Sequence, residues 1–197
     1  MLILGHTSIT LGTAVVVEAL RRPRAPGSTD ATGVPQRLHG ALVSLSRRVD
    51  LRLLLVGSLL PDIIDKPLGL LLLPDVFGTG RIYCHALIFP VALATIGVIP
   101  YLKYKSNGLL VLAYGAVMHL VLDSMWLNQG TLFWPVTELS LPAVASTGWL
   151  GNIFLSLLTN PAAYFPEIAG AILLLPVFLL VKRSGGVLHF LRTGTLD

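Results

Sequence analysis

The chain has 197 residues, of which 54% are hydrophobic and only 12% are charged, and its formal net charge is +4. Soluble domains carry about 25% charged residues, so this composition, with a mean hydropathy of +0.78, excludes an ordinary soluble enzyme and indicates an integral membrane protein. Cys84 is the only cysteine, which excludes a disulfide framework and a zinc site built from thiolates. The basic residues are gathered in a few loops, as membrane topology requires, so they do not indicate nucleic-acid binding.

Apolar segments follow one another along the chain, and each is close to the ~20 residues that cross a bilayer as a helix. They cover residues 2–20, 51–73, 84–102, 109–127 and 162–181. A further apolar piece, 149–158, is too short to span, and we expect a re-entrant or interfacial helix there. The sequence therefore predicts an all-α, polytopic membrane bundle with about five transmembrane helices and short interfacial helices.

The charges of the loops distinguish the two membrane sides of this protein, which we expect to be a single integral membrane domain over residues 1–197. Loop 21–50 is rich in arginine, and the helical spacing of apolar residues between Leu38 and Val49 predicts an amphipathic helix on the cytoplasmic surface. Loop 128–161 contains no lysine or arginine, so we expect it outside the cytoplasm, with a short helix in it. The positive-inside rule then places the N-terminus outside the cytoplasmic membrane and the C-terminus in the cytoplasm.

Six ionisable side chains lie within or at the edge of these apolar segments. They are His6, Asp62, Asp65, His85, His119 and Asp123. An ionisable residue in a membrane span is costly and points to a functional site, and the predicted topology places all six near the outer leaflet. Asp62 and Asp65 are spaced i,i+3, and His119 and Asp123 are spaced i,i+4, so each pair shares one helix face.

Imidazoles and carboxylates are ligands of divalent metal ions. We therefore expect these six residues to hold one or two ions, with Zn²⁺ preferred and Mn²⁺ or Mg²⁺ as alternatives that the carboxylates allow. The competing interpretation makes each residue a hydrogen-bond partner between helices, with Asp65 and Lys66 as a structural pair. Burying several unpaired carboxylates is expensive, which favours the metal site for the set as a whole.

Three further charged residues have more than one interpretation. Arg81 precedes His85 by about one helical turn, so it could contact an anionic group such as phosphate or extend to water. Glu138 lies in the outer loop and Glu167 in the last apolar segment. Each acid could support the metal ligands, act as a general acid or base, or simply lie at the membrane interface.

The order of these motifs resembles the YdjM-like family of membrane-bound proteins, to which metal-dependent hydrolysis is ascribed. The motifs are Gly5-His6-Thr7, Leu60-Pro61-Asp62-Ile63-Ile64-Asp65, Arg81-Ile82-Tyr83-Cys84-His85, His119-Leu120-Val121-Leu122-Asp123 and Trp134-Pro135. The resemblance implies that the six ionisable residues form the site, with a more distant similarity to zinc-dependent phospholipase C enzymes. One motif departs from the family's usual Arg-Gly-x-Thr-His-Ser, because Ile82, Cys84 and Ala86 replace Gly, Thr and Ser.

From the residues and the resemblance together, we expect a membrane-embedded hydrolase that uses metal-activated water on an amphipathic lipid or lipid-linked substrate, with a phosphoester preferred. Asp65 or Asp123 would take the proton, and Arg81 would contact the anion. The alternatives are a metal or proton transporter and a structural metal-binding membrane protein. The absence of an internal repeat in the sequence argues against the common transporter designs.

Overall fold

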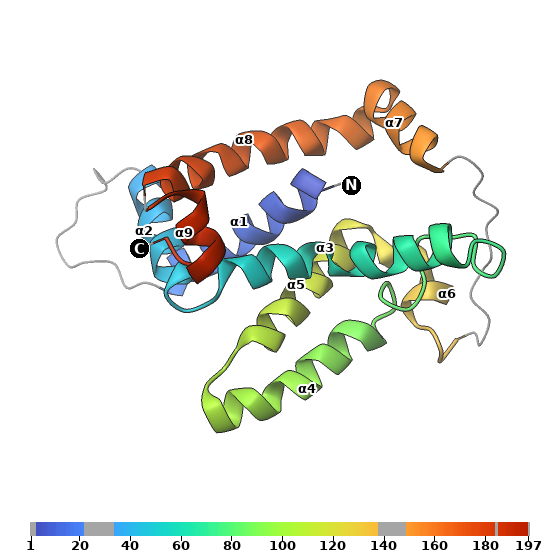
Figure 1. Ribbon diagram of the computed structural model, residues 1–197, viewed down its shortest axis with the longest axis horizontal. Helices are drawn as coiled ribbons and strands as arrows, with labels where there is room; N and C mark the ends of the chain where they lie inside the picture. Colours follow the sequence, from blue (N-terminus) through green and yellow to red (C-terminus); the bar gives the residue numbers. More distant parts are fainter. Residues whose placement is uncertain (1–2, 22–33, 138–148, 184, 197) are drawn as a thin grey trace.

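The computed structural model describes residues 3–21, 34–137, 149–183 and 185–196, and in these ranges the secondary structure is helical, with no strand. Figure 1 shows the helices. Their bounds are α1 Ile3–Arg21, α2 Val34–Ser46, α3 Leu51–Pro67, the π-helical turn η1 Leu68–Leu72, α4 Ile88–Tyr104, α5 Gly108–Leu122, the 3₁₀ turn η2 Met125–Leu127, α6 Gln129–Leu132, α7 Trp149–Thr159, α8 Pro161–Arg183 and α9 Gly186–Thr193. The prediction of an all-α protein is therefore confirmed over the described ranges.

Helix α1 lies at the centre of the arrangement, between α8 on one side and α3 and α5 on the other (Figure 1). It also contacts α2, while α4 packs on the far side of α5. The amphipathic helix predicted in the basic loop is present as α2, which buries Ala41, Leu42 and Leu45. These side chains join apolar residues of α1 and α3 in a hydrophobic cluster that lies at the α2 end of the bundle.

The expected number of membrane spans is not confirmed. Within the part of the chain that the structure describes, two helices are long and apolar enough to cross a membrane: α1, with a mean hydropathy of 1.5, and residues 163–183 of α8, with a mean hydropathy of 2.1. Helices α4 and α5 are apolar but shorter. The second apolar segment loses its regular helix after Pro67, and the third begins its helix only at Ile88, so helical structure covers less of these segments than hydropathy alone predicted.

Two glycines allow α3 and α5 to approach closely. A Cβ atom on Gly115 would lie 2.5 Å from the carbonyl carbon of Gly57, and one on Gly57 would lie 2.8 Å from the carbonyl oxygen of Leu112. Any larger residue would force the helix backbones apart. The contact brings the backbone of Ser58 next to His119, four residues beyond Gly115.

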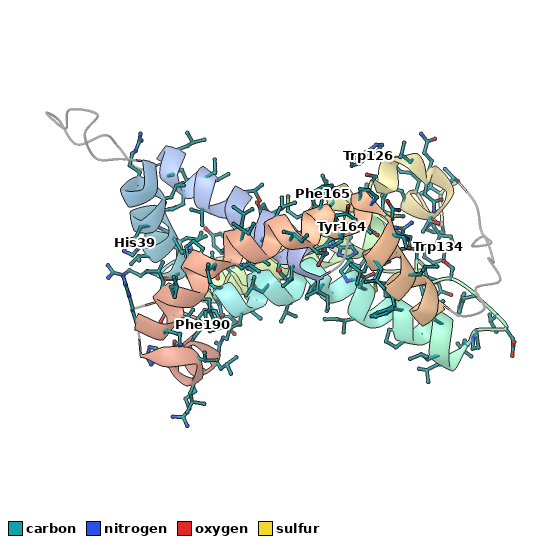
Figure 2. The ribbon with its side chains drawn as sticks, turned by 90° about the horizontal axis from the view of Figure 1, so that it is seen from above. His39, Trp126, Trp134, Tyr164, Phe165 and Phe190 are labelled. Carbon is teal, nitrogen blue, oxygen red and sulfur yellow. The ribbon has the colours of Figure 1, made fainter. Side chains whose placement is uncertain are left out.

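Several aromatic side chains lie toward one end of the molecule. Figure 2 shows Trp126, Trp134, Tyr164 and Phe165 on the side away from His39, while Phe190 lies on the side of His39. Of these, Phe165 and Trp126 are more than half exposed, as is common for aromatic side chains at a membrane interface. These exposed aromatic side chains agree with a membrane location, while the orientation across the membrane stays a prediction.

Candidate metal centre

Helices α1, α3 and α5, with the segment before α4, bring the six predicted residues together. His6 comes from the first turns of α1, Asp62 and Asp65 from α3, and His119 from α5. Asp123 is the C-cap of α5, where its backbone N–H donates to the His119 carbonyl. His85 differs from the expectation that it opens a helix, because it lies in the turn before α4. All three imidazoles are fully buried.

The ligand atoms form two groups that share His119. One group contains His6, His119 and Asp123, and the other contains Asp62, His85 and His119. Within each group, one ligand atom per residue lies within 4.8 Å of the others. The rings of His6 and His119 are stacked, with centroids 4.3 Å apart. Asp65 belongs to neither group.

The ring of His119 is oriented by the backbone of α3. Its Nδ1 lies 2.7 Å from the Ser58 carbonyl oxygen, and because a carbonyl can only accept, Nδ1 must donate. In the neutral ring, Nε2 then has a lone pair available for a cation. That Nε2 lies 3.3 Å from Nε2 of His85 and 3.7 Å from Oδ1 of Asp62.

Asp65 orients His85 from the other side. Its carboxylate accepts hydrogen bonds from the backbone N–H groups of Ile82 (2.8 Å), Cys84 (3.0 Å) and His85 (3.2 Å). Its Oδ2 is also 2.8 Å from Nδ1 of His85. A carboxylate in this position fixes the tautomer of an imidazole and turns Nε2 toward the ion. The structure therefore places Asp65 behind His85, although the sequence grouped it with the ligands and candidate bases.

Asp62 and Asp123 lie at the more open edge of the cluster, and each pairs with a cation. Oδ2 of Asp62 is 2.5 Å from Nζ of Lys66, and its Oδ1 is 3.5 Å from Nε2 of His85. Oδ2 of Asp123 accepts from Nη2 of Arg81 at 2.8 Å, and its Oδ1 is 3.2 Å from Nε2 of His6. Arg81 is 47% exposed and Lys66 29% exposed, against 7% and 16% for the two carboxylates, so the cations stand between the cluster and the solvent.

Glu167 of α8 reaches the first turn of α1, just before His6. Its carboxylate accepts from the backbone N–H of Leu4 at 2.8 Å and of Gly5 at 3.2 Å. An acid at this place satisfies backbone donors that a helix leaves unpaired and complements the helix dipole. Gly170 allows this approach, because a Cβ there would lie 2.5 Å from the Leu4 carbonyl oxygen. Glu167 therefore holds the element that carries His6.

Sequence reasoning missed two contributors to this centre. Lys66 was considered only as a partner of Asp65, although its i,i+4 spacing from Asp62 was the signal for the pair that forms. The Ser58 carbonyl had no signal in the sequence, because a backbone group is the same at every residue. Glu138 lies outside the described residues, so its role stays open.

The donor set fits a divalent metal ion. Three buried imidazoles and two carboxylates converge, and each of the His85 and His119 rings is held through Nδ1 so that Nε2 points into the cluster. The apolar helices of membrane-spanning length and the two groups of His and Asp side chains together define the class: a helical membrane protein with a candidate metal centre.

The chain belongs to the YdjM inner membrane protein family, whose model matches residues 1–189. This confirms the family resemblance noted in the sequence and assigns the protein to the inner membrane. No curated protein and no solved structure matches the chain.

Proposed function

We propose that this protein is a membrane-embedded, metal-dependent hydrolase that acts on an amphipathic lipid or lipid-linked substrate, preferably at a phosphoester. The observation that carries the proposal is the convergence of three Nε2 atoms and two carboxylates behind a partly exposed arginine. Arg81, which pairs with Asp123 and is 47% exposed, is also a group that an anionic substrate can contact.

His6, His85, His119, Asp62 and Asp123 would hold the metal. When bound, a divalent ion supplies Lewis-acid chemistry that polarises the scissile bond and brings the pKa of water toward ~7. A ring nitrogen has one lone pair, and Nδ1 of His119 is already used on Ser58, so His119 can ligate only one ion. A single ion would therefore use the His119 that both groups share, and a second ion would have to be held without it. Zn²⁺ remains the preferred ion for this mixture of nitrogen and oxygen ligands.

Arg81 and Asp123 would act together on the substrate. Arg81 uses Nε and Nη2 on Asp123, and guanidinium groups bind phosphate as readily as carboxylate. A phosphate that enters the opening would take over these N–H donors and release Oδ2 of Asp123. That oxygen can then accept a proton from the attacking water, which makes Asp123 the proposed general base.

Asp65 would have a positioning role. Its oxygens are engaged by three backbone N–H groups and by the His85 ring, so it is poorly placed to receive a proton from water. We propose that it keeps His85 in the tautomer and orientation that bind metal.

The first experiment measures bound metal in the purified protein. The wild-type chain should carry at least one transition-metal ion, and His119→Ala should lower the metal content by one ion per chain, because the ion that His119 ligates loses that ligand. His189→Ala, on α9, is the matched control and should keep the wild-type metal content. Wild-type metal content in the His119→Ala protein would remove this cluster as the metal centre.

The second experiment measures hydrolysis of a panel of phospholipids and neutral ester lipids. Arg81→Ala should lower turnover of phosphate-bearing lipids by about 10- to 100-fold, the effect of losing charged hydrogen bonds, without changing metal content. Arg192→Ala, on α9, is the control. Cleavage of neutral ester lipids alone would refute the assignment of a phosphoester substrate. If no lipid is hydrolysed and metal passes into liposomes, the result would favour the transporter alternative.

A further inference from the structure

A second site lies on the other face of α1. An apolar groove of about 630 Å³ runs between α1, α2 and α8, a volume in the range of small-molecule sites. Its walls include Leu11, Val15, Leu42, Leu173, Val177 and Leu180. Gly12 also lines it, and a Cβ on Gly12 would meet no atom within 4 Å, so the groove is open at this point.

Helix α1 separates this groove from the metal centre. Ser8 lines the groove, while His6 contacts His119 of α5. Two residues along an α-helix correspond to a rotation of roughly 200°, so the two side chains point in nearly opposite directions. The groove is therefore not an extension of the metal centre, and inferences about it do not depend on the proposed hydrolysis.

One end of the groove is basic. His39 and Arg183 belong to its lining, and Figure 2 shows His39 at the end of the molecule where α2 lies. His39 also belongs to a neighbouring hollow of about 480 Å³, which Ser44, Arg47 and Arg48 line. Among the described residues that line either hollow, none is acidic. The nearby Glu18 is buried and accepts a hydrogen bond from Ser44 at 2.7 Å.

We propose that this groove binds one anionic phospholipid of the surrounding membrane. The acyl chain lies along the apolar walls of α1 and α8, and the phosphate lies at the basic end against Arg183 and His39. Three observations favour a lipid: α1 and α8 have the length and hydropathy of membrane spans, the groove is apolar, and its charge is confined to one end. Basic pockets between membrane helices are typical sites for anionic headgroups.

The bound lipid would join three elements of the fold. α2 and α8 both contact α1, and the groove is the space between all three. A lipid that fills this space ties α2 and α8 to α1, and α1 carries His6. We therefore expect the phospholipid to act as a stabilising component rather than as a substrate.

The test uses the full-length protein in neutral detergent, with native mass spectrometry and thermal unfolding. Palmitoyl-oleoyl phosphatidylglycerol is the anionic probe, and the phosphatidylcholine with the same chains is the neutral one. The wild-type protein should retain one phosphatidylglycerol and show a higher Tm with it than with phosphatidylcholine. Arg183→Ala should weaken retention about fivefold, the effect of one basic residue on an anionic lipid, and Lys103→Ala should leave it unchanged.

A second variant fills the groove itself. Gly12→Leu places a side chain where a Cβ has open space, so the protein should fold and keep its metal while losing the retained phosphatidylglycerol. Gly151→Leu is the matched control, because a Cβ there also meets nothing within 4 Å, and it should bind the lipid normally. Unchanged retention in Gly12→Leu, or equal retention of phosphatidylcholine, would overturn the proposal. A dimer that dissociates on Gly12→Leu would assign the groove to a second copy of the chain instead.

Discussion

At the scale of single residues, Asp65 and His85 show how a buried carboxylate can position a metal ligand without itself contacting the metal or the substrate. The carboxylate is fully buried, and three backbone N–H groups and one imidazole surround it. These bonds compensate its desolvation, because a carboxylate that accepts several N–H bonds replaces most of its lost hydration. The same bonds fix the turn at residues 82–85, from which His85 reaches the ligand cluster.

Replacing Asp65 with asparagine tests this positioning role. The amide NH₂ would face backbone N–H donors, so His85 should lose its orientation, and Zn²⁺ affinity should fall by about 10- to 100-fold. Competition titration of the purified protein with a chelator measures this change. Asp75→Asn, at an exposed position, should have no effect. A loss of metal as complete as that in His119→Ala would instead make Asp65 a ligand.

At the scale of helices, the centre depends on how closely α3 and α5 pack. His119 donates to the Ser58 carbonyl, and these two residues are 61 positions apart in the chain. The contact is possible only because Gly57 and Gly115 let the two backbones meet. Small residues at helix contacts are typical of membrane proteins, in which close packing replaces much of the hydrophobic driving force.

Gly115→Ala tests the contact between α3 and α5. The added Cβ would lie 2.5 Å from the Gly57 carbonyl carbon, and overpacking of this kind costs about 1–3 kcal/mol. We expect a lower Tm and weaker metal binding, because His119 moves away from Ser58. Gly151→Ala should be neutral or slightly stabilising, since alanine favours a helix by roughly 0.5–1 kcal/mol over glycine. Wild-type Tm and metal affinity in Gly115→Ala would show that the contact is not needed.

The start of α3 depends on a charged cap. Asp50 accepts from the backbone N–H of Arg52 at 2.9 Å, and the Arg52 guanidinium donates to it at 2.6 Å. The same guanidinium donates to the Leu191 carbonyl oxygen at 2.7 Å. The side-chain hydrogen bond from Arg52 to Asp50 therefore holds the pKa of Asp50 below its usual range. The hydrogen bond from Arg52 to Leu191 joins the start of α3 to α9.

The lowered pKa of Asp50 predicts a pH-dependent stability. Because its pKa is lower in the folded chain, Asp50 stabilises the fold above its unfolded pKa of about 3.9, and this contribution is lost as the pH falls through the folded pKa. Asparagine caps a helix about as well as aspartate but cannot form the ion pair with Arg52. Asp50→Asn should therefore lower Tm at pH 7, with a cost of about 0.2–1 kcal/mol for the lost, partly exposed ion pair. The difference between wild type and variant should shrink toward pH 3 in detergent. A difference that stays constant down to pH 3 would contradict the role of the charge.

At the scale of the whole molecule, the basic end and the metal centre are separated along the bundle. The hydrophobic cluster lies at the α2 end, with His39, Arg47 and Arg48. Figure 2 shows Phe190 on the side of His39, and Trp126, Trp134, Tyr164 and Phe165 away from it. A gathering of basic residues at one end is what the positive-inside rule predicts for a membrane protein. The family assignment gives the inner membrane, and the orientation within it stays a prediction from the loop charges.

Single-cysteine labelling in intact cells tests that orientation. We expect Ser106→Cys, in the connection between α4 and α5, to react only from the cytoplasm, and Asp75→Cys to react from the outside. Both positions are exposed, while the natural Cys84 is buried, so the unsubstituted chain should show little labelling with a membrane-impermeant reagent. The reverse pattern would move the metal centre to the cytoplasmic leaflet.

Hydropathy and spacing were enough to predict the helical class and the residues that gather at the centre, and the order of the motifs was enough to predict the family by resemblance. They work because an ionisable side chain in an apolar segment is expensive wherever the helix lies, so its presence carries information without a structure. The number of spans stays unconfirmed, because apolar composition does not show where a helix ends. The regular α-helix of the second segment ends at Pro67, and His85 lies in a turn within the third.

Only the tertiary structure decided what each of these residues does. Asp62 and Asp65 are three positions apart on α3, yet Asp62 faces the imidazoles while Asp65 turns to the backbone of residues 82–85. Three features join residues that are far apart in the chain: two groups share His119, Glu167 caps α1, and Arg81 pairs with Asp123. Local sequence determines which side chains are costly to bury, but their partners depend on how the helices pack.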